Sequence, residues 1–164
     1  MKRSEEDQKT NLLVVLSNPP TTSGVRTLQR VELARETLGY SAVQIANLFS
    51  IPTYRTGDIS SVGAVAGGWL AARAGLSAAL SKADAVVLAY GCQEPSGEAR
   101  LHFRDQLSWL EAEIEDQGVR TWMLEGRPRH PSRWHRHTHV VYPDLPFAEA
   151  LVRVLLPVED VRGA

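Results

Sequence analysis

The sequence predicts a three-layer α/β/α domain, in which helices cover both faces of a central, mostly parallel sheet of four to five strands. Short apolar runs such as NLLVVLS (11–17) and DAVVLAYG (84–91) are continuous rather than alternating, which is typical of strands buried on both faces. Segments with helical spacing lie between these runs, as parallel strands require. The 164 residues suffice for one such domain, expected over residues 11–157.

Turn residues mark the ends of the first elements. The strand at 11–17 stops at the sequence NPP, and a helix is expected over 25–38 because Gly39 is placed to end it. SAVQIANLF predicts a second strand over 41–49. A loop rich in proline, glycine, serine and threonine is expected from about 51 to 65.

The second half of the chain continues the alternation. A helix is expected over 67–83, before the strand at 84–91, and a long amphipathic helix over 96–118. The apolar stripe of the long helix is expected to consist of Leu101, Leu107, Leu110 and Ile114. The remaining expected elements are a strand over 119–126, a short edge strand within HTHVVYP (137–143) and a closing helix over 146–156.

Composition excludes several classes of protein. The net charge is −1, so any argument for nucleic acid must be local. Cys92 is the only cysteine, which rules out an internal disulfide and a cysteine-based zinc site. No apolar run approaches a membrane span, and the charged N-terminus lacks a signal-peptide core, so a cytoplasmic protein is expected. Residues 1–10 are expected to be a disordered tail, and residues 158–164 a C-terminal tail.

The stretch GRPRHPSRWHRHTHV (126–140) holds four histidines, four arginines and no acidic residue. One interpretation is a solvated basic loop. A second is a metal site, because His137 and His139 would share a face of an extended segment, with His130 or His135 completing the set. Four arginines would repel a cation and no carboxylate is near in sequence, so no metal is expected. No cofactor is expected either. The third interpretation is an active site, since Pro128 and Pro131 stiffen the chain around His130.

The predicted topology places this stretch at one edge of the sheet. Ligands of open parallel α/β sheets bind outside the carboxyl ends of the strands. The segments that leave those ends are SNPPTT, NLFSIPTYRT, YGCQEPSG and GRPRHPSRWHRH, so the His/Arg stretch is expected to face SNPP and NLF across one cleft. The common nucleotide-binding glycine motifs are missing. Cys92 is interpreted as a small turn residue rather than a nucleophile.

The order of several motifs resembles a bacterial and phage family of unknown function (number sixteen-forty-three). That family has N-P-S-T, T-x-x-R, G-Y…N-L-F, A-W-G and P-R-H-P segments. This chain has NPPT (18–21), TLQR (27–30), GYSAVQIANLF (39–49), AYG (89–91) and PRHP (128–131). It departs from the pattern at Pro20, at Thr22–Ser23, where the family tends to be acidic, and at Tyr90, which replaces Trp.

A more distant resemblance is to the uracil-DNA glycosylase superfamily. Those enzymes have a D-P or N-P turn, an Asn ending the second strand, a W-G strand end and an H-P-S motif; here these positions are Asn18–Pro19, Asn47, Tyr90–Gly91 and His130–Pro131–Ser132. The resemblance implies a glycosylase-like fold and hydrolysis of an N-glycosidic bond in DNA or a nucleotide.

Residue roles follow from this resemblance. His130 would stabilise the departing base, a contribution worth about 3–4 kcal/mol for such donors. Asn18 would position water, Asn47 would pair with the base, and Phe49 or Tyr54 would stack on it. The aligned motifs add Pro19, Gly91 and Ser132 as ligand-binding residues.

Residues after H-P-S enter the duplex in DNA-acting members of that superfamily. Trp134 would then be a wedge, unless it is partly buried in the domain, and the phosphates would be held by arginines. The expected phosphate-binding residues are Arg30, Arg129, Arg133 and Arg136. The expected partner is a nucleotide, a nucleoside or damaged or modified nucleic acid. The sequence is compatible with a monomer and does not fix the oligomeric state. Two alternatives remain: a binding module without chemistry, and another small-molecule nucleoside or nucleotide enzyme.

Overall fold

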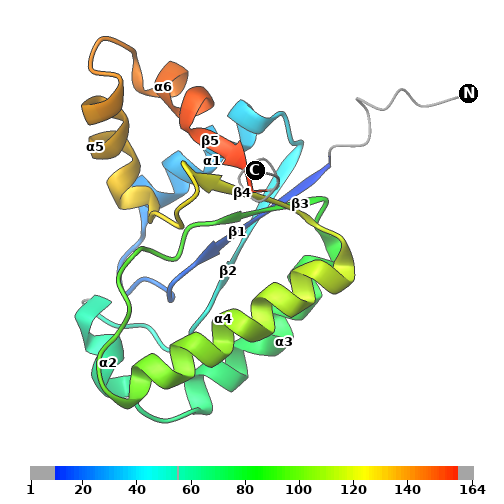
Figure 1. Cartoon of the computed structure of the whole chain (residues 1–164), viewed down its shortest axis with the longest axis vertical. Coiled ribbons are helices and arrows are strands. Elements are labelled where there is room, and N and C mark those ends of the chain that lie inside the picture. The colour runs from blue at the N-terminus through cyan, green and yellow to red at the C-terminus, as the bar shows by residue number, and fades with distance from the viewer. Residues whose placement is uncertain (1–9, 55, 159–164) are drawn as a thin grey trace, which may run out of the picture.

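A computed structural model describes residues 10–54 and 56–158, which form one sheet flanked by helices (Figure 1). In chain order the elements are β1 (Asn11–Leu16), α1 (Val25–Leu38), β2 (Ala42–Asn47), a 3₁₀ turn η2 (Thr56–Asp58), α2 (Ile59–Val62), α3 (Gly67–Lys82), β3 (Ala85–Leu88), α4 (Glu98–Gln117), β4 (Arg120–Leu124), α5 (Pro131–Val141), α6 (Phe147–Val154) and β5 (Leu155–Pro157). In the described part of the chain, no helix is long and apolar enough to cross a bilayer.

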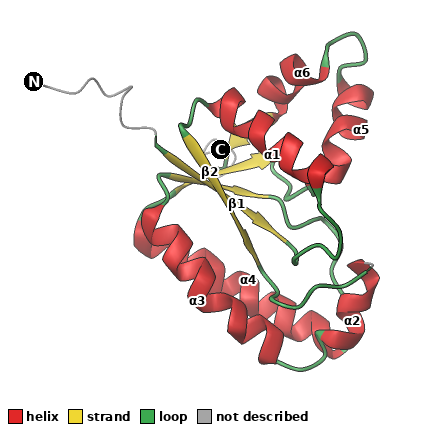
Figure 2. Ribbon diagram, turned by 180° about the vertical axis from the view of Figure 1, so that it is seen from behind, coloured by secondary structure: helices red, strands yellow, loops and turns green. Residues whose placement is uncertain are grey.

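The five strands have the order β2-β1-β3-β4-β5. The first four are parallel, and β5 runs antiparallel to β4. Helices α3 and α4 cover one face of this sheet, and α1, α5 and α6 cover the other (Figure 2). The prediction of a three-layer α/β domain with a mostly parallel sheet is therefore confirmed.

Strand β1 shows why the apolar runs are continuous. Leu13 and Val15 pack into the core beneath α3 and α4, whereas Leu12, Val14 and Leu16 pack into the core beneath α1 and α6. Side chains of a strand alternate between faces, so a strand covered on both faces is apolar at every position. The same arrangement applies to β3, whose four residues are all buried.

Two glycines meet specific backbone needs. Gly39 has φ 80° and its N–H donates to the carbonyls of Arg35 and Glu36, which ends α1 as predicted. Gly68, at the start of α3, lies against Phe49: a Cβ atom there would be 2.3 Å from Cε2 of that ring. Helix α3 therefore approaches the end of β2 closely only because position 68 has no side chain.

One predicted element is wrong, and the predicted closing helix is present as α6 but ends earlier than expected. HTHVVYP is not an edge strand, because residues 131–141 form α5, with His130 as its N-cap and Pro131 at its first position. The fifth strand is instead Leu155–Pro157, the end of the segment expected to be a closing helix.

The predicted stripe of the long helix is wrong at Leu101, whose side chain is 60% exposed. The buried positions of α4 are Ala99, Phe103, Gln106 and Leu110. The expected tails lie outside the described residues except for Thr10 and Val158, whose N–H groups donate to the Asp84 carboxylate and the Thr121 carbonyl.

Candidate functional site

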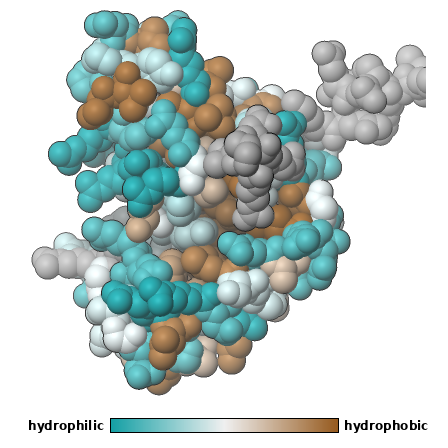
Figure 3. Space-filling view, in the orientation of Figure 1, coloured by the Kyte–Doolittle hydropathy of each residue, from teal (hydrophilic) through white to brown (hydrophobic). Residues whose placement is uncertain are grey.

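A solvent-open cleft of about 690 Å³ lies at the carboxyl ends of β1, β3 and β4. This volume is typical of small-molecule sites. In Figure 3, hydrophilic side chains gather on the side of the molecule where α5 lies, above a recess that separates it from the α2–α4 side. The residues that line the cleft are Ser17, Asn18, Tyr90, Gly91, Cys92, Gln93, Arg129, His130, Ser132, Arg133, Arg136, His137 and Val140.

His130 is mounted at the N-terminus of α5. Its Nδ1 atom accepts a hydrogen bond from the backbone N–H of Ser132 at 3.1 Å and lies 2.9 Å from the Ser132 hydroxyl. A backbone N–H can only donate, so Nδ1 must be the unprotonated nitrogen. The neutral ring then carries its proton on Nε2. The cap therefore fixes both the orientation and the tautomer of His130.

The surroundings of His130 keep the ring neutral. Burial lowers the pKa of its imidazole below the ordinary value of 6.5, and the positive charges of Arg30 and Arg133 lower it further. Each effect disfavours the charged imidazolium form. At neutral pH the side chain is therefore a neutral hydrogen-bond donor rather than a cation.

Three hydrogen bonds fix the segment that carries His130. The Gly91 N–H, in a left-handed turn at φ 96°, donates to the Pro128 carbonyl at 2.6 Å. The Trp134 indole donates to the Arg129 carbonyl at 2.8 Å, and Arg30 donates to the Pro131 carbonyl at 2.9 Å. The segments after β3 and β4 are thus joined directly, and α1 holds the first turn of α5.

Asn18 enters the cleft from the segment after β1. Its Nδ2 atom donates to the Ile51 carbonyl at 3.1 Å and to the Thr53 hydroxyl at 2.8 Å. The carbonyl can only accept, so this contact fixes which end of the amide is nitrogen. Among the described residues the Oδ1 atom has no hydrogen-bond donor, so it can accept a hydrogen bond from a water molecule.

Arginine side chains make the cleft cationic. Arg129, Arg133 and Arg136 line it, and none of the three pairs with a carboxylate of a described residue. The Nε atom of Arg129 is buried and has no hydrogen-bond partner within the described residues. No Asp or Glu is among the lining residues of the cleft. Such a surface suits an anionic ligand.

The predicted site is therefore brought together only in part. His130, Asn18, Gly91, Ser132 and the three arginines 129, 133 and 136 share the cleft, as the strand-end rule predicted. Arg30 contacts the Pro131 carbonyl instead of lining the cleft. Pro19 and Tyr54 are not among the lining residues, and Tyr54 is 79% exposed.

The NLF segment does not face the cleft. The backbone of β2 continues to pair with β1, because the N–H groups of Leu48 and Phe49 donate to the carbonyls of Leu16 and Ser17. This turns Phe49 into the core, where its side chain is 0% exposed and its ring centroid lies 4.6 Å from that of Trp69. The prediction that Phe49 stacks on a base is therefore wrong. Asn47 is likewise not a lining residue; its Oδ1 atom is buried and lacks a partner in the described part of the chain.

The wedge prediction for Trp134 is also wrong. Its side chain is 0% exposed and belongs to the core beneath α1 and α6. It sits on the inner face of α5 with Thr138, one helical turn later. A wholly buried indole cannot enter a nucleic-acid duplex, so its function is to anchor α5.

Helix α5 also separates His137 and His139, the two histidines that the alternative interpretation places together in a metal site. His137 contacts the Glu125 carboxylate at 3.1 Å, while the side chain of His139 is exposed on another side of α5. Residues two apart in a helix do not face each other. Among the described residues there is no group of three or more His, Cys, Asp or Glu side chains that could hold a metal ion.

Several lining residues were not predicted as ligand contacts: Ser17, Tyr90, Cys92, Gln93, His137 and Val140. Ser17 and Gln93 follow strand ends, so the strand-end rule contained the signal for them. His137 and Val140 share a face of α5 with Arg133, a spacing that is meaningful only once the segment is known to be helical.

Fold and site together define an α/β domain with a cationic cleft at the carboxyl edge of a mostly parallel sheet. The chain belongs to the family described as "Protein of unknown function (DUF1643)", which matches residues 1–132. No curated protein and no solved structure matches the chain significantly. The first resemblance is confirmed, whereas the resemblance to uracil-DNA glycosylases stays a prediction.

Proposed function

We propose that the cleft binds a nucleoside phosphate and that the protein hydrolyses its N-glycosidic bond. The observation that carries this proposal is the state of His130: a neutral imidazole, capped at Nδ1, that has a proton to donate from Nε2. It lies in a cleft with three arginines unpaired among the described residues. The site therefore offers a fixed donor for a leaving group beside a surface for phosphate.

The chemistry uses these residues as follows. The bond between the sugar carbon and the base nitrogen breaks, and its electron pair leaves with the base. A hydrogen bond from His130 Nε2 to an oxygen of the base stabilises the developing negative charge. Water, accepted at Asn18 Oδ1, adds to the sugar carbon, and its proton balances the charge of the released base. The products are a free base and a sugar phosphate.

Two features favour a small ligand over a duplex. Trp134, the expected wedge, is buried, and the net charge of the chain is −1. Proteins that extrude a base from a duplex must offset the energy of unstacking it, and they gain affinity from several Lys and Arg contacts to phosphates. We therefore place free nucleotides and nucleosides first, and modified nucleic acid second.

A second candidate is binding without turnover. No described Asp or Glu lines the cleft, so Asn18 orients water without removing its proton. A nucleotide sensor of the same fold would need the arginines but not His130 Nε2. The two candidates thus differ in what loss of His130 does.

The test is a base-release assay on nucleoside monophosphates, nucleosides and uracil-containing DNA, with excess protein. Wild type should release free base, His130→Ala should be slower by about 100- to 1000-fold, and Asn18→Ala should also be slower. Asn47→Ala serves as the control outside the cleft and should match wild type. Ligand binding without base release would establish the second candidate and overturn hydrolysis.

A further inference from the structure

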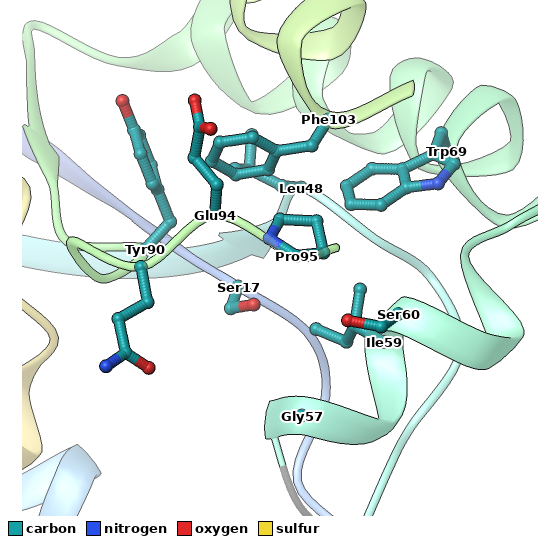
Figure 4. A pocket seen from close by; sticks show the side chains of 11 residues that line it. Ser17, Leu48, Gly57, Ile59, Ser60, Trp69, Tyr90, Glu94, Pro95 and Phe103 are labelled. Carbon is teal, nitrogen blue, oxygen red and sulfur yellow. The ribbon is translucent and has the colours of Figure 1, made fainter. Parts of the chain in front are cut away.

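A second hollow, of about 70 Å³, opens beside the cleft. The two share Ser17, Tyr90 and Gln93, so they form one continuous surface. Figure 4 shows Tyr90, Phe103 and Trp69 on one side of this hollow and Ser17, Ile59 and Ser60 on the other. We call it the ring pocket; its other lining residues are Leu48, Gly57, Gln93, Glu94 and Pro95.

Aromatic rings form one wall of the ring pocket. Phe103 stands edge-on to both Tyr90 and Trp69, with ring centroids 6.1 Å apart in each pair. Burial raises the pKa of the Tyr90 hydroxyl to about 12, so that side chain is neutral throughout the physiological range. Neutral aromatic walls favour a planar, uncharged group.

The polar groups around the ring pocket carry little free charge. The Glu94 carboxylate accepts two hydrogen bonds from Arg104, at 3.1 and 2.9 Å, and lies 3.4 Å from Arg100. The Ser60 hydroxyl oxygen accepts the Ser96 N–H at 3.0 Å, which leaves its O–H free to donate. Among the described residues, Glu94 is the only charged side chain that lines the ring pocket, and arginines pair with it, whereas the adjoining cleft is cationic.

We propose that the ring pocket receives a single planar ring of the ligand whose phosphate lies in the cleft, with Tyr90 at the junction. The small volume of the ring pocket favours a single ring over a two-ring base. The choice of a nucleoside phosphate as the ligand rests on the proposed function. The ring pocket takes the place that the sequence resemblance assigned to Asn47 and Phe49, which do not line the cleft.

The test is calorimetric titration of the full chain with three probes: inorganic phosphate, a pyrimidine nucleoside monophosphate and a purine nucleoside monophosphate. The pyrimidine nucleotide should bind about tenfold more tightly than the other two, in keeping with the contribution of one stacked base. Ser60→Leu, which fills the ring pocket, should abolish this advantage and leave phosphate binding unchanged. Ser61→Leu, on the same short helix but outside the ring pocket, should behave as wild type.

Retained phosphate binding shows that the Ser60→Leu protein is folded. If that variant does not fold, Tyr90→Leu should lose the advantage and Tyr90→Phe should keep it. Equal affinity for the two nucleotides, or an advantage that survives Ser60→Leu or Tyr90→Leu, would overturn the ring pocket. Selective binding without base release would reject only the proposed hydrolysis, whereas base release unaffected by Ser60→Leu would reject only the ring pocket.

Discussion

His130 shows how one residue acquires a chemical state from its neighbours. The backbone of Ser132 chooses the tautomer, and burial together with Arg30 and Arg133 keeps the ring uncharged. The flanking prolines are visible in the sequence and predicted a rigid histidine. The cap itself was not predictable, because the sequence interpretation placed no helix after His130 and expected a strand over the second half of what is α5.

Removing one of these charges should change the pKa of His130 in a defined direction. Arg133→Gln should raise it, since less positive charge then opposes protonation of the imidazole. The measurement is an NMR titration of the five histidines in both proteins. Arg127→Gln, which changes an arginine outside the cleft lining, is the matched control and should leave the titration of His130 unchanged.

The same pKa couples His130 to stability. The unfolded chain takes up this proton near pH 6.5, whereas the folded protein does so only at a lower pH. Above pH 6.5, the protonation of His130 should therefore not affect the free energy of unfolding. This free energy should fall as the pH is lowered from 6.5 to the folded pKa and then level off. A wild-type pKa above 6.5, or one insensitive to Arg133→Gln, would contradict this description of the site.

At the scale of elements, α3 and α5 illustrate opposite outcomes. Helix α3 lies where the sequence predicts it. Its close contact between Gly68 and Phe49 is a tertiary feature that no local sequence pattern reveals. The β-branched residues Thr138, Val140 and Val141 of HTHVV favour a strand, yet the segment belongs to helix α5. Its true inner face is Trp134 and Thr138, four residues apart, and its packing on the core decides its structure.

Gly68→Ala should destabilise the fold, because its Cβ would lie 2.3 Å from Phe49 Cε2 and 2.8 Å from Cζ. We expect a loss of about 1–3 kcal/mol in the free energy of unfolding, as for other overpacked cores. Gly75→Ala, in the same helix, has no neighbouring atom within 4 Å and should stabilise by about 0.5–1 kcal/mol. Urea denaturation measures both; equal effects of the two substitutions would contradict the close approach.

On the scale of the whole molecule, the site is assembled from segments after three strands. Parallel strands with one direction bring their carboxyl ends to one edge, so the sequence predicted that Asn18, Gly91 and His130 would meet. The sequence did not predict that the NLF segment (47–49) would lie outside the cleft. The end of β2 continues pairing with β1 and buries Phe49, which depends on how long two strands remain in register.

Positive charge is concentrated in one place on the molecule. The net charge of the chain is −1, yet three arginines line the same cleft. Arg133→Gln and Arg136→Gln should each weaken binding of a nucleoside monophosphate by about tenfold or more, the effect of losing one charge-assisted hydrogen bond. Neither should weaken binding of the unphosphorylated nucleoside. Calorimetry of both ligands checks this, with Arg127→Gln as the control, and parallel losses for both ligands would show that the arginines do not hold phosphate.

The pH dependence of base release from a nucleoside monophosphate tests the central claim most directly. Protonation of Nδ1 would break the cap from the Ser132 N–H and release the ring from its fixed orientation. The rate should therefore be constant at neutral pH and fall as the pH is lowered through the folded pKa of His130, below 6.5. Arg133→Gln should move this fall to higher pH. Absence of base release, or a profile unchanged in Arg133→Gln and in His130→Gln, would contradict hydrolysis with His130 as the donor.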